Sequence, residues 1–365
     1  MPKKPLVIDD IPYLESLKKR KVAALHIHWD GSIPAEDLFA LAQKKERTLL
    51  LPENDIEGRS IAYASQEERI IHSAEKLKAF QMNLRRYSIV DVFSVPVGFM
   101  QMKEDLIEMA KLHCRYLRSQ NIPYAESRFA PQYHLFRGLS LEKVIGYSLE
   151  GFEQGKEETG VIVKPIICIG REASTDISER VVKAALQFQG KVVGIDLACE
   201  EKGNPPEKHY PAFALTFDTF LKRTVHAGEM CSEEENLKNV YTALTLLRAD
   251  GLGHAIPLWK RMHEGVDLVD LVLKNNVRLE SNPVSNYHFF IENIEDLHLD
   301  LLLKEGVLVT VNPDDSAMWS CGDLVHNLYF LGNLYDGNFV DIVVDNSFKA
   351  AWGLSDEEKS KIAFP

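Results

Sequence analysis

Cysteine is scarce in this 365-residue chain, and long apolar runs are absent. The five cysteines are scattered and form no C-x-x-C pair, so neither a disulfide framework nor a thiolate zinc knuckle is predicted. No stretch of about 18 apolar residues could span a bilayer, and the N-terminus lacks the apolar segment of a secretory signal. We therefore expect a soluble protein of the reducing cytoplasm with no membrane partner.

Basic residues are in the minority, with 42 Lys and Arg against 54 Asp and Glu and a formal net charge of -12. This balance repels the phosphates of a polynucleotide, so a small-molecule substrate is expected and a nucleic-acid partner is not. The sequence also lacks the H-E-x-x-H, G-x-S-x-G, G-x-x-x-x-G-K-[ST] and P-C-x-x-C motifs. Protease, esterase, nucleotide triphosphatase and cytidine-deaminase-type functions therefore have no support. The oligomeric state cannot be read from these residues.

Short β-rich runs alternate with amphipathic segments of helical period, which is typical of repeated βα units around a parallel sheet. The expected strands are Val22 to His28, Ile122 to Phe129, Val161 to Ile169, Val192 to Leu197, Arg223 to His226, Gly251 to His254, Val277 to Glu280 and Val307 to Val311. Eight such units predict an α/β fold of the (β/α)8 TIM-barrel type. No linker or composition shift divides the chain, so we expect one domain over residues 1–365.

Amphipathic segments are expected to form helices at Leu141 to Glu158, Ser232 to Leu247 and Val266 to Lys274. The connection between the first two strands is longer than one crossover helix requires. It contains two helical segments, Gln66 to Leu84 and Lys103 to Gln120. We interpret residues 48–120 as a helical insertion that covers the barrel mouth as a lid.

Four histidines lie where expected strands end. His26 and His28, in ALHIHWDGS, are two residues apart and so project from one face of a strand. His226 ends the strand in VHAGE and His254 ends the strand in GLGHA. Barrels keep their active sites at the carboxyl ends of strands. An H-x-H pair alone could equally be hydrogen-bonded or exposed, but four such histidines on one rim favour a functional cluster.

Carboxylates follow these strands as well. Glu229 comes three residues after His226, and VTVNPDDS places Asp314 and Asp315 after the eighth strand. Three imidazoles and a carboxylate form a nitrogen and oxygen site that suits zinc and leaves room for a water. Zinc lowers the pKa of that water from about 15.7 toward about 7, so hydrolysis is the implied reaction class.

In order along the chain, HIHWDGS, YAESRFAP, GIDLACEE, VHAGE, GLGHA, SNPVSN and VNPDDS resemble motifs of the adenosine deaminase family of metal-dependent amidohydrolases. The resemblance spans nearly the whole chain and implies one zinc ion per chain, bound by His26, His28, His226 and Asp314. It implies that Glu229 protonates purine N1 and that His254 orients the attacking water.

The same resemblance implies the substrate contacts. Asp315 would accept a hydrogen bond near N7, and Asp30, Gly31 and His28 would border the sugar and the reacting centre. The backbone N–H at Cys199 would meet N3. The bland alternatives are a surface carboxylate for Glu229, a helix N-cap for Asp315 and a turn residue for Asp30.

The implied function is zinc-dependent deamination of a 6-aminopurine nucleoside, with adenosine giving inosine and ammonia. Adenine, a modified adenosine and aminodeoxyfutalosine are alternative substrates, and a catalytically silent nucleoside-binding protein is the non-enzymatic alternative. Retention of every implied ligand, of the acid and of the rim histidine argues against the silent alternative.

Several residues depart from the family pattern. Cys199 in DLACEE stands where glycine is usual, Trp29 replaces an aliphatic residue, and Ala255 replaces a glycine after His254. Pro313 and Ser316 flank the aspartate pair where threonine and proline are common. A nucleophilic role for Cys199 is not expected, because no basic residue is adjacent to it.

One further pair alternates with apolar neighbours in YAESRF. Glu126 and Arg128 are therefore expected to form an internal salt bridge rather than to take part in catalysis.

Overall fold

The computed structural model describes residue 3, residues 5–55 and residues 59–363. The expected limits of the domain (1–365) and of the insertion (48–120) thus include a few residues outside the described ones. In the described part of the chain, eight parallel strands follow one another in the order β1-β2-β4-β5-β6-β7-β10-β11. Their bounds are β1 Ala23–His28, β2 Tyr124–Phe129, β4 Ile166–Gly170, β5 Gly194–Ala198, β6 Lys222–Ala227, β7 Gly251–His254, β10 Arg278–Ser281 and β11 Leu308–Val311.

The two ends of this sheet meet, which closes the barrel. A parallel bridge joins Ile27 to Asp314, and the His28 N–H donates to the Asp314 carbonyl at 3.0 Å. The predicted (β/α)8 barrel is confirmed: seven of the eight expected strands are present with small shifts at their ends, and the third is divided. Closure also brings the end of β1 beside the segment that follows β11.

The third expected strand, Val161 to Ile169, is interrupted. Ile162–Val163 form a short strand, β3, that pairs with β2, and β4 begins only at Ile166. Pro165 lies between the two. Proline has no N–H to donate to a ladder and is confined to strand edges and breaks, which explains the division.

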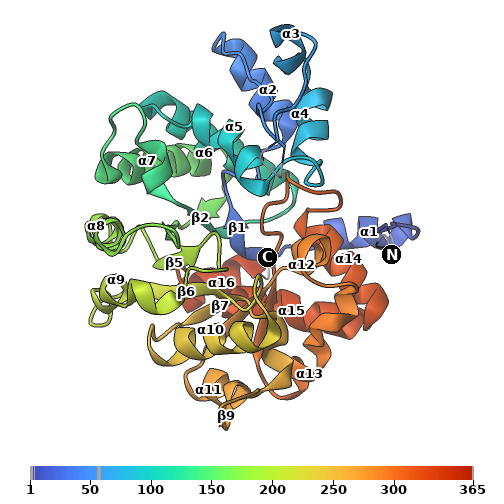
Figure 1. Ribbon diagram of the computed structural model, residues 1–365. Helices are drawn as coiled ribbons and strands as arrows, with labels where there is room; N and C mark the ends of the chain where they lie inside the picture. The colour runs from blue at the N-terminus through green and yellow to red at the C-terminus, as the bar shows by residue number, and fades with distance from the viewer. Residues whose placement is uncertain (1–2, 4, 56–58, 364–365) are drawn as a thin grey trace.

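Helices surround the barrel (Figure 1). Those before β1 and after β2 are α1 Ile11–Lys18, α7 Leu141–Thr159, α8 Thr175–Leu186, α9 Tyr210–Ala214, α10 Glu233–Thr245, α11 Leu268–Lys274, α12 Pro283–Phe289, α13 Leu299–Lys304, α14 Leu324–Leu334, α15 Gly337–Lys349 and α16 Asp356–Ala363. Short 3-10 turns are η1 Pro131–His134, η2 Pro206–His209, η3 Ile256–Lys260 and η4 Ile294–Leu297. Met262–His263 (β8) and Val266–Asp267 (β9) form a small hairpin. None of the described helices is long and apolar enough to cross a membrane.

Two expected helices have different bounds. The segment Gln66 to Leu84 is broken into α3 Gln66–Arg69 and α4 Ala74–Gln81. Between them the Ile71 N–H donates to the Leu49 carbonyl at 2.9 Å, and Ser73 caps α4 by accepting from the Lys76 N–H. The segment Val266 to Lys274 begins as β9, and α11 starts only after Asp267, whose carboxylate accepts from the Val269 N–H. In both cases a capping side chain starts the helix later than hydrophobic periodicity predicts.

The insertion contains more helices than expected. It also contains α5 Ile89–Phe99 before α6 Lys103–Ser119, and a further helix, α2 Ala35–Lys44, precedes it. Figure 1 shows α2 to α5 gathered together on one side of the barrel, whereas α6 lies beside α7 in the outer ring. The Phe93 ring of α5 has its centroid 6.5 Å from that of His28. The insertion therefore reaches the carboxyl ends of the strands through α5.

Candidate metal centre and catalytic pocket

The carboxyl rim of the barrel brings together the four side chains implied as metal ligands. His26 and His28 come from β1, His226 from β6, and Asp314 from the segment after β11. One nitrogen or oxygen of each lies within 4.8 Å of all the others. His26 Nε2 and His28 Nε2 are 3.1 and 3.2 Å from His226 Nε2, and 3.3 and 3.5 Å from Asp314 Oδ1.

These distances test whether the four residues fit zinc. A tetrahedral zinc ion with bonds of about 2.0–2.1 Å separates its ligand atoms by roughly 3.3 Å. The observed separations of 3.1–3.5 Å surround that value. His26 and His226 each direct Nδ1 at a buried carboxylate, so in the neutral rings the proton lies on Nδ1 and the two Nε2 atoms are acceptors that cannot hydrogen-bond each other. The donor set therefore fits a divalent cation of the zinc type.

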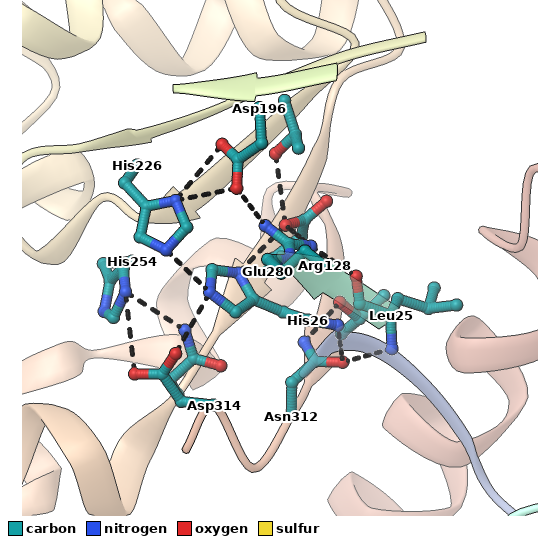
Figure 2. Close-up of polar contacts among 12 residues, drawn as sticks. Leu25, His26, Arg128, Asp196, His226, His254, Glu280, Asn312 and Asp314 are labelled. Carbon is teal, nitrogen blue, oxygen red and sulfur yellow. Dashed lines mark hydrogen bonds and ion pairs between the residues drawn. The ribbon is translucent and has the colours of Figure 1, made fainter. Parts of the chain in front are cut away.

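Buried carboxylates orient two of the imidazoles from behind (Figure 2). Glu280 Oε2 accepts from His26 Nδ1 at 3.0 Å, and Asp196 Oδ2 accepts from His226 Nδ1 at 3.0 Å. Arg128 donates to both carboxylates, at 2.8 Å each. Such contacts fix which ring nitrogen faces the metal and raise its basicity.

The internal salt bridge expected for YAESRF exists with different partners. Arg128 pairs with Asp196 and Glu280, while Glu126 pairs with Arg278 at 2.6 Å. Side chains two apart on a strand point to the same face, but the partners of both residues lie on β5 and β10, strands that are not adjacent to β2 in the sheet. A direct Glu126–Arg128 pair was therefore the wrong partner assignment.

Glu229 lies beside this cluster with its carboxyl group 3.3 Å from His254 Nε2. It is 6% exposed, which does not fit a surface carboxylate. Burial raises the pKa of Glu229 to about 7. The group can therefore hold a proton near neutral pH, which is the state that a general acid needs.

His254 has a defined orientation. Its Nδ1 is 2.6 Å from Asn286 Oδ1, so this nitrogen carries a proton and donates it. Its Nε2 faces Glu229 and lies 3.9 Å from Asp314 Oδ2. Burial alone would lower the pKa of His254, but the carboxylates of Glu229 and Asp314 together raise it.

Asp315 is buried directly against Gly31. A side-chain carbon at position 31 would lie 1.8 Å from Asp315 Oδ1, so only glycine leaves room for this carboxyl group. Burial, the Asp314 charge and the Asp30 charge raise the pKa of Asp315 well above its ordinary value. Because N7 of an adenine ring can only accept, the expected contact of Asp315 with N7 requires the carboxyl group to be the donor, and the contact itself stays a prediction.

Asp30 is also buried, and its Oδ1 has no hydrogen-bond partner. Burial raises the pKa of Asp30 to about 7. Its Oδ2 lies 4.0 Å from His134 Nε2, which is itself buried without a partner. Sequence reasoning missed His134, although RFAPQYH places it directly after the second strand.

Cys199 adopts a left-handed backbone conformation, with φ 76°. This explains why glycine is usual at the position, because L-residues other than glycine are strained there. Burial raises the pKa of Cys199 to about 12, which leaves a neutral thiol and excludes a reactive thiolate at neutral pH. Its Sγ lies 3.5 Å from the Tyr133 hydroxyl. Ala255 is similar, with φ 43° where glycine is usual.

The SNPVSN motif surrounds this site, although no role was expected for it. Ser285 Oγ donates to Asp314 Oδ2 at 2.6 Å, and Asn282 and Asn286 contact the two nitrogens of His254. Its position could have indicated such a role, because the motif lies at the end of a barrel strand.

A parallel barrel with three histidines and a carboxylate on its carboxyl rim has the architecture of a metal-dependent hydrolase. A family model described as "Adenosine deaminase" matches residues 21–363. The chain is 30% identical over 348 residues to an adenine deaminase of Wolinella succinogenes, with 94% of this chain and 96% of that protein covered. It is 28% identical over 337 residues to an adenosine deaminase of Clostridium kluyveri, with 91% and 90% covered.

Among solved structures, the adenine deaminase of Arthrobacter aurescens superposes with a TM-score of 0.75 at 24% identity, covering 94% of this chain and 97% of that one. At this identity the likeness shows the shared fold. The match to the family model covers nearly the entire chain. The protein belongs to the adenosine deaminase family, whose members are hydrolases that act on carbon–nitrogen bonds.

Proposed function

We propose that this protein is a zinc-dependent hydrolase that removes the 6-amino group of a purine nucleoside, converting adenosine and water into inosine and ammonia. One observation carries the proposal: Glu229, a buried acid with a pKa of about 7, lies beside a cluster of four ligand-type side chains. Hydrolytic deamination needs both elements, because water must be activated at C6 while the ring nitrogen N1 is protonated.

His26, His28, His226 and Asp314 would hold one zinc ion. The spacing of their donor atoms and the carboxylates behind His26 and His226 support this assignment. When bound, zinc supplies a Lewis acid that makes hydroxide available at neutral pH.

The remaining polar groups of the pocket would handle protons. Glu229 would deliver its proton to N1 as C6 loses its ring conjugation. His254 would orient the attacking water through Nε2, because its Nδ1 is already committed to Asn286. Asp315, held neutral by burial and by neighbouring carboxylates, would donate to N7 and so fix the plane of the purine.

Asp30 would line the sugar side of the pocket, and Cys199 would contact the purine ring next to it. Asp30 Oδ1 is buried and unpartnered, so a ribose hydroxyl that donates to it would repair a costly unsatisfied acceptor. The Cys199 N–H would meet N3, with Gly31 and His28 bordering the substrate. Carboxyl groups at this edge disfavour a 5'-phosphate.

Adenine is the second candidate substrate, because the relative from Wolinella succinogenes is an adenine deaminase that is 30% identical over nearly the whole chain. The two candidates differ in what they require of Asp30. A free base has no hydroxyl group that could donate to the Asp30 carboxyl group, whereas the ribose of a nucleoside supplies such a hydroxyl.

The test is a substrate panel with zinc-replete protein: adenosine, 2'-deoxyadenosine, N6-methyladenosine, aminodeoxyfutalosine, adenine and AMP. Release of the amine (ammonia, or methylamine from N6-methyladenosine) and the shift of the purine absorbance band would both be followed. We expect the highest kcat/KM with adenosine and the lowest with AMP. Preference for adenine would transfer the proposal to the second candidate, and nucleoside binding without release of ammonia or methylamine from any compound would establish a silent homologue.

A further inference from the structure

Glu201, in the loop after β5, makes an unusual set of contacts with the loop after β6. Its Oε1 accepts from the Gly228 N–H at 2.8 Å, and its Oε2 accepts from the N–H groups of Glu229 and Met230 at 2.9 and 3.0 Å. The Asn239 amide of α10 donates to Oε1 at 2.9 Å. The Glu201 side chain is fully buried.

Three successive backbone N–H groups that converge on one point form an anion-binding nest. Gly228 makes this possible with φ 81°, a left-handed conformation that turns its N–H toward the same side as the next two. Here the anion is a carboxylate of the protein itself. Burial alone would raise the pKa of Glu201, but Arg171 and these N–H groups lower it, so the group is ionised.

The loop held in this way carries Glu229, whose carboxyl group faces His254 at 3.3 Å. The backbone of Glu229 donates to Glu201 while its side chain points into the pocket, so the position of one group sets the position of the other. Arg171, which follows β4, adds a third connection by donating to the His226 carbonyl while lying 3.8 Å from Glu201.

We propose that Glu201 is a positioning residue for Glu229: its carboxylate fixes the loop of residues 228–230 so that the acid meets the reacting ring at one distance and angle. The part of this inference that concerns proton transfer rests on the proposed function, whereas the anchoring of the loop does not. A misplacement of about 1 Å at such a site costs on the order of 100-fold in rate.

Glu201→Gln is the sharpest test. Each carboxylate oxygen accepts two donors, so the amide nitrogen of glutamine must turn N–H groups toward other N–H groups, whichever way it is placed. We expect hydrogen exchange of the amides at 228–230 to accelerate by at least ~10-fold, measured by mass spectrometry of peptides across this loop. We also expect kcat to fall by ~100-fold, with KM changed less than about 3-fold and zinc content unchanged.

Asn239→Ala is a milder variant, which removes one donor and leaves the three backbone contacts intact. It should produce smaller changes in the same direction, and it serves if Glu201→Gln does not fold. Asp105→Asn is the matched control, because Asp105 is another buried carboxylate, paired with Lys45 and Arg47 away from this loop. It should leave exchange at 228–230 and kcat at wild-type values even if thermal stability falls.

Unchanged exchange at 228–230 in Glu201→Gln would overturn the anchoring. A loss of kcat no larger than the loss of folded or zinc-loaded protein would overturn the positioning role. If the wild type deaminates no purine, the proposed function fails, yet the exchange measurement still decides whether Glu201 holds the loop.

Discussion

Two buried clusters of charge occupy the same barrel and differ in how their carboxylates are paired. In the floor cluster, defined by Arg128, Arg278, Glu126, Asp196 and Glu280, each carboxylate has an arginine partner at 2.6–2.8 Å. In the pocket cluster, defined by Asp30, Glu229 and Asp315, burial and the charges of Asp30 and Glu229 raise the pKa of Asp315. Asp30 Oδ1 and Asp315 Oδ1 are buried without a hydrogen-bond partner.

Buried carboxyl groups therefore have two different functions in this barrel, and their pKa values distinguish them. Burial alone would raise the pKa of Asp196 and Glu280, but nearby cationic groups outweigh it and hold both pKa values well below the ordinary range. Burial raises the pKa of Glu229 and Asp30 to about 7, because no arginine is close enough to reverse it. Asp196 and Glu280 thus stay ionised and orient histidines, whereas the carboxyl groups of Glu229 and Asp30 can hold and release protons.

The largest expected effect comes from the pocket. Glu229→Gln should lower kcat by ~10³-fold or more, because an amide cannot deliver a proton to N1. Metal analysis should find zinc bound as in the wild type, since Glu229 is not one of the four implied ligands. Activity near that of the wild type would remove Glu229 from the mechanism.

A change in the floor should act on the metal instead. Glu280→Gln puts a mismatched amide at the contact with His26 Nδ1 and breaks the pairing with Arg128 and Arg278. We expect zinc affinity to fall by roughly 10 to 100-fold in a competition assay with a chelator. If zinc affinity stays unchanged while kcat falls, the division between floor and pocket is wrong.

The pH profile should report the pocket acid. Glu229 must be protonated to act, and its pKa is raised to about 7, so its active form dominates below pH 7 and is lost above it. We expect kcat/KM to fall about tenfold per pH unit on the alkaline side, beyond an apparent pKa near 7. A profile that stays flat to pH 9 would contradict this assignment.

The smallest effect concerns Cys199. Cys199→Gly relieves a left-handed residue, so the free energy of unfolding should rise by up to about 1–2 kcal/mol, offset in part by the greater freedom of glycine in the unfolded chain. Thermal unfolding checks this, and the substrate panel shows whether the added space changes preference by more than about tenfold. Lower stability would show that the thiol contact with Tyr133 outweighs the strain.

Much of the architecture could be read from residue patterns. The alternation of strands with helices along the chain predicted the barrel. A parallel strand that is buried on both faces needs a continuous apolar run, and a helix must follow it. Rim histidines could be picked out because each ends such a run. The starts of α4 and α11 could not be picked out, since Ser73 and Asp267 cap these helices through local contacts that compete with periodicity.

The ion pairs inside the barrel could not be predicted from the sequence. Neighbours in YAESRF suggested a Glu126–Arg128 bridge, but the partners of these residues come from strands 68 to 152 positions away in the chain. The raised pKa of Asp315 also depended on distant groups, because the Asp30 and Glu229 side chains approach it only once the barrel closes.

The sequence by itself determined the eight βα units and the set of side chains at their ends, because hydrophobic period and position in a strand are local properties. Only the tertiary structure decided which acids are paired with arginine and which are not, and it placed Glu201 under the loop that carries Glu229. The physical reason is that a carboxyl group's charge and direction depend on burial and on neighbours that the closed barrel brings within a few ångströms.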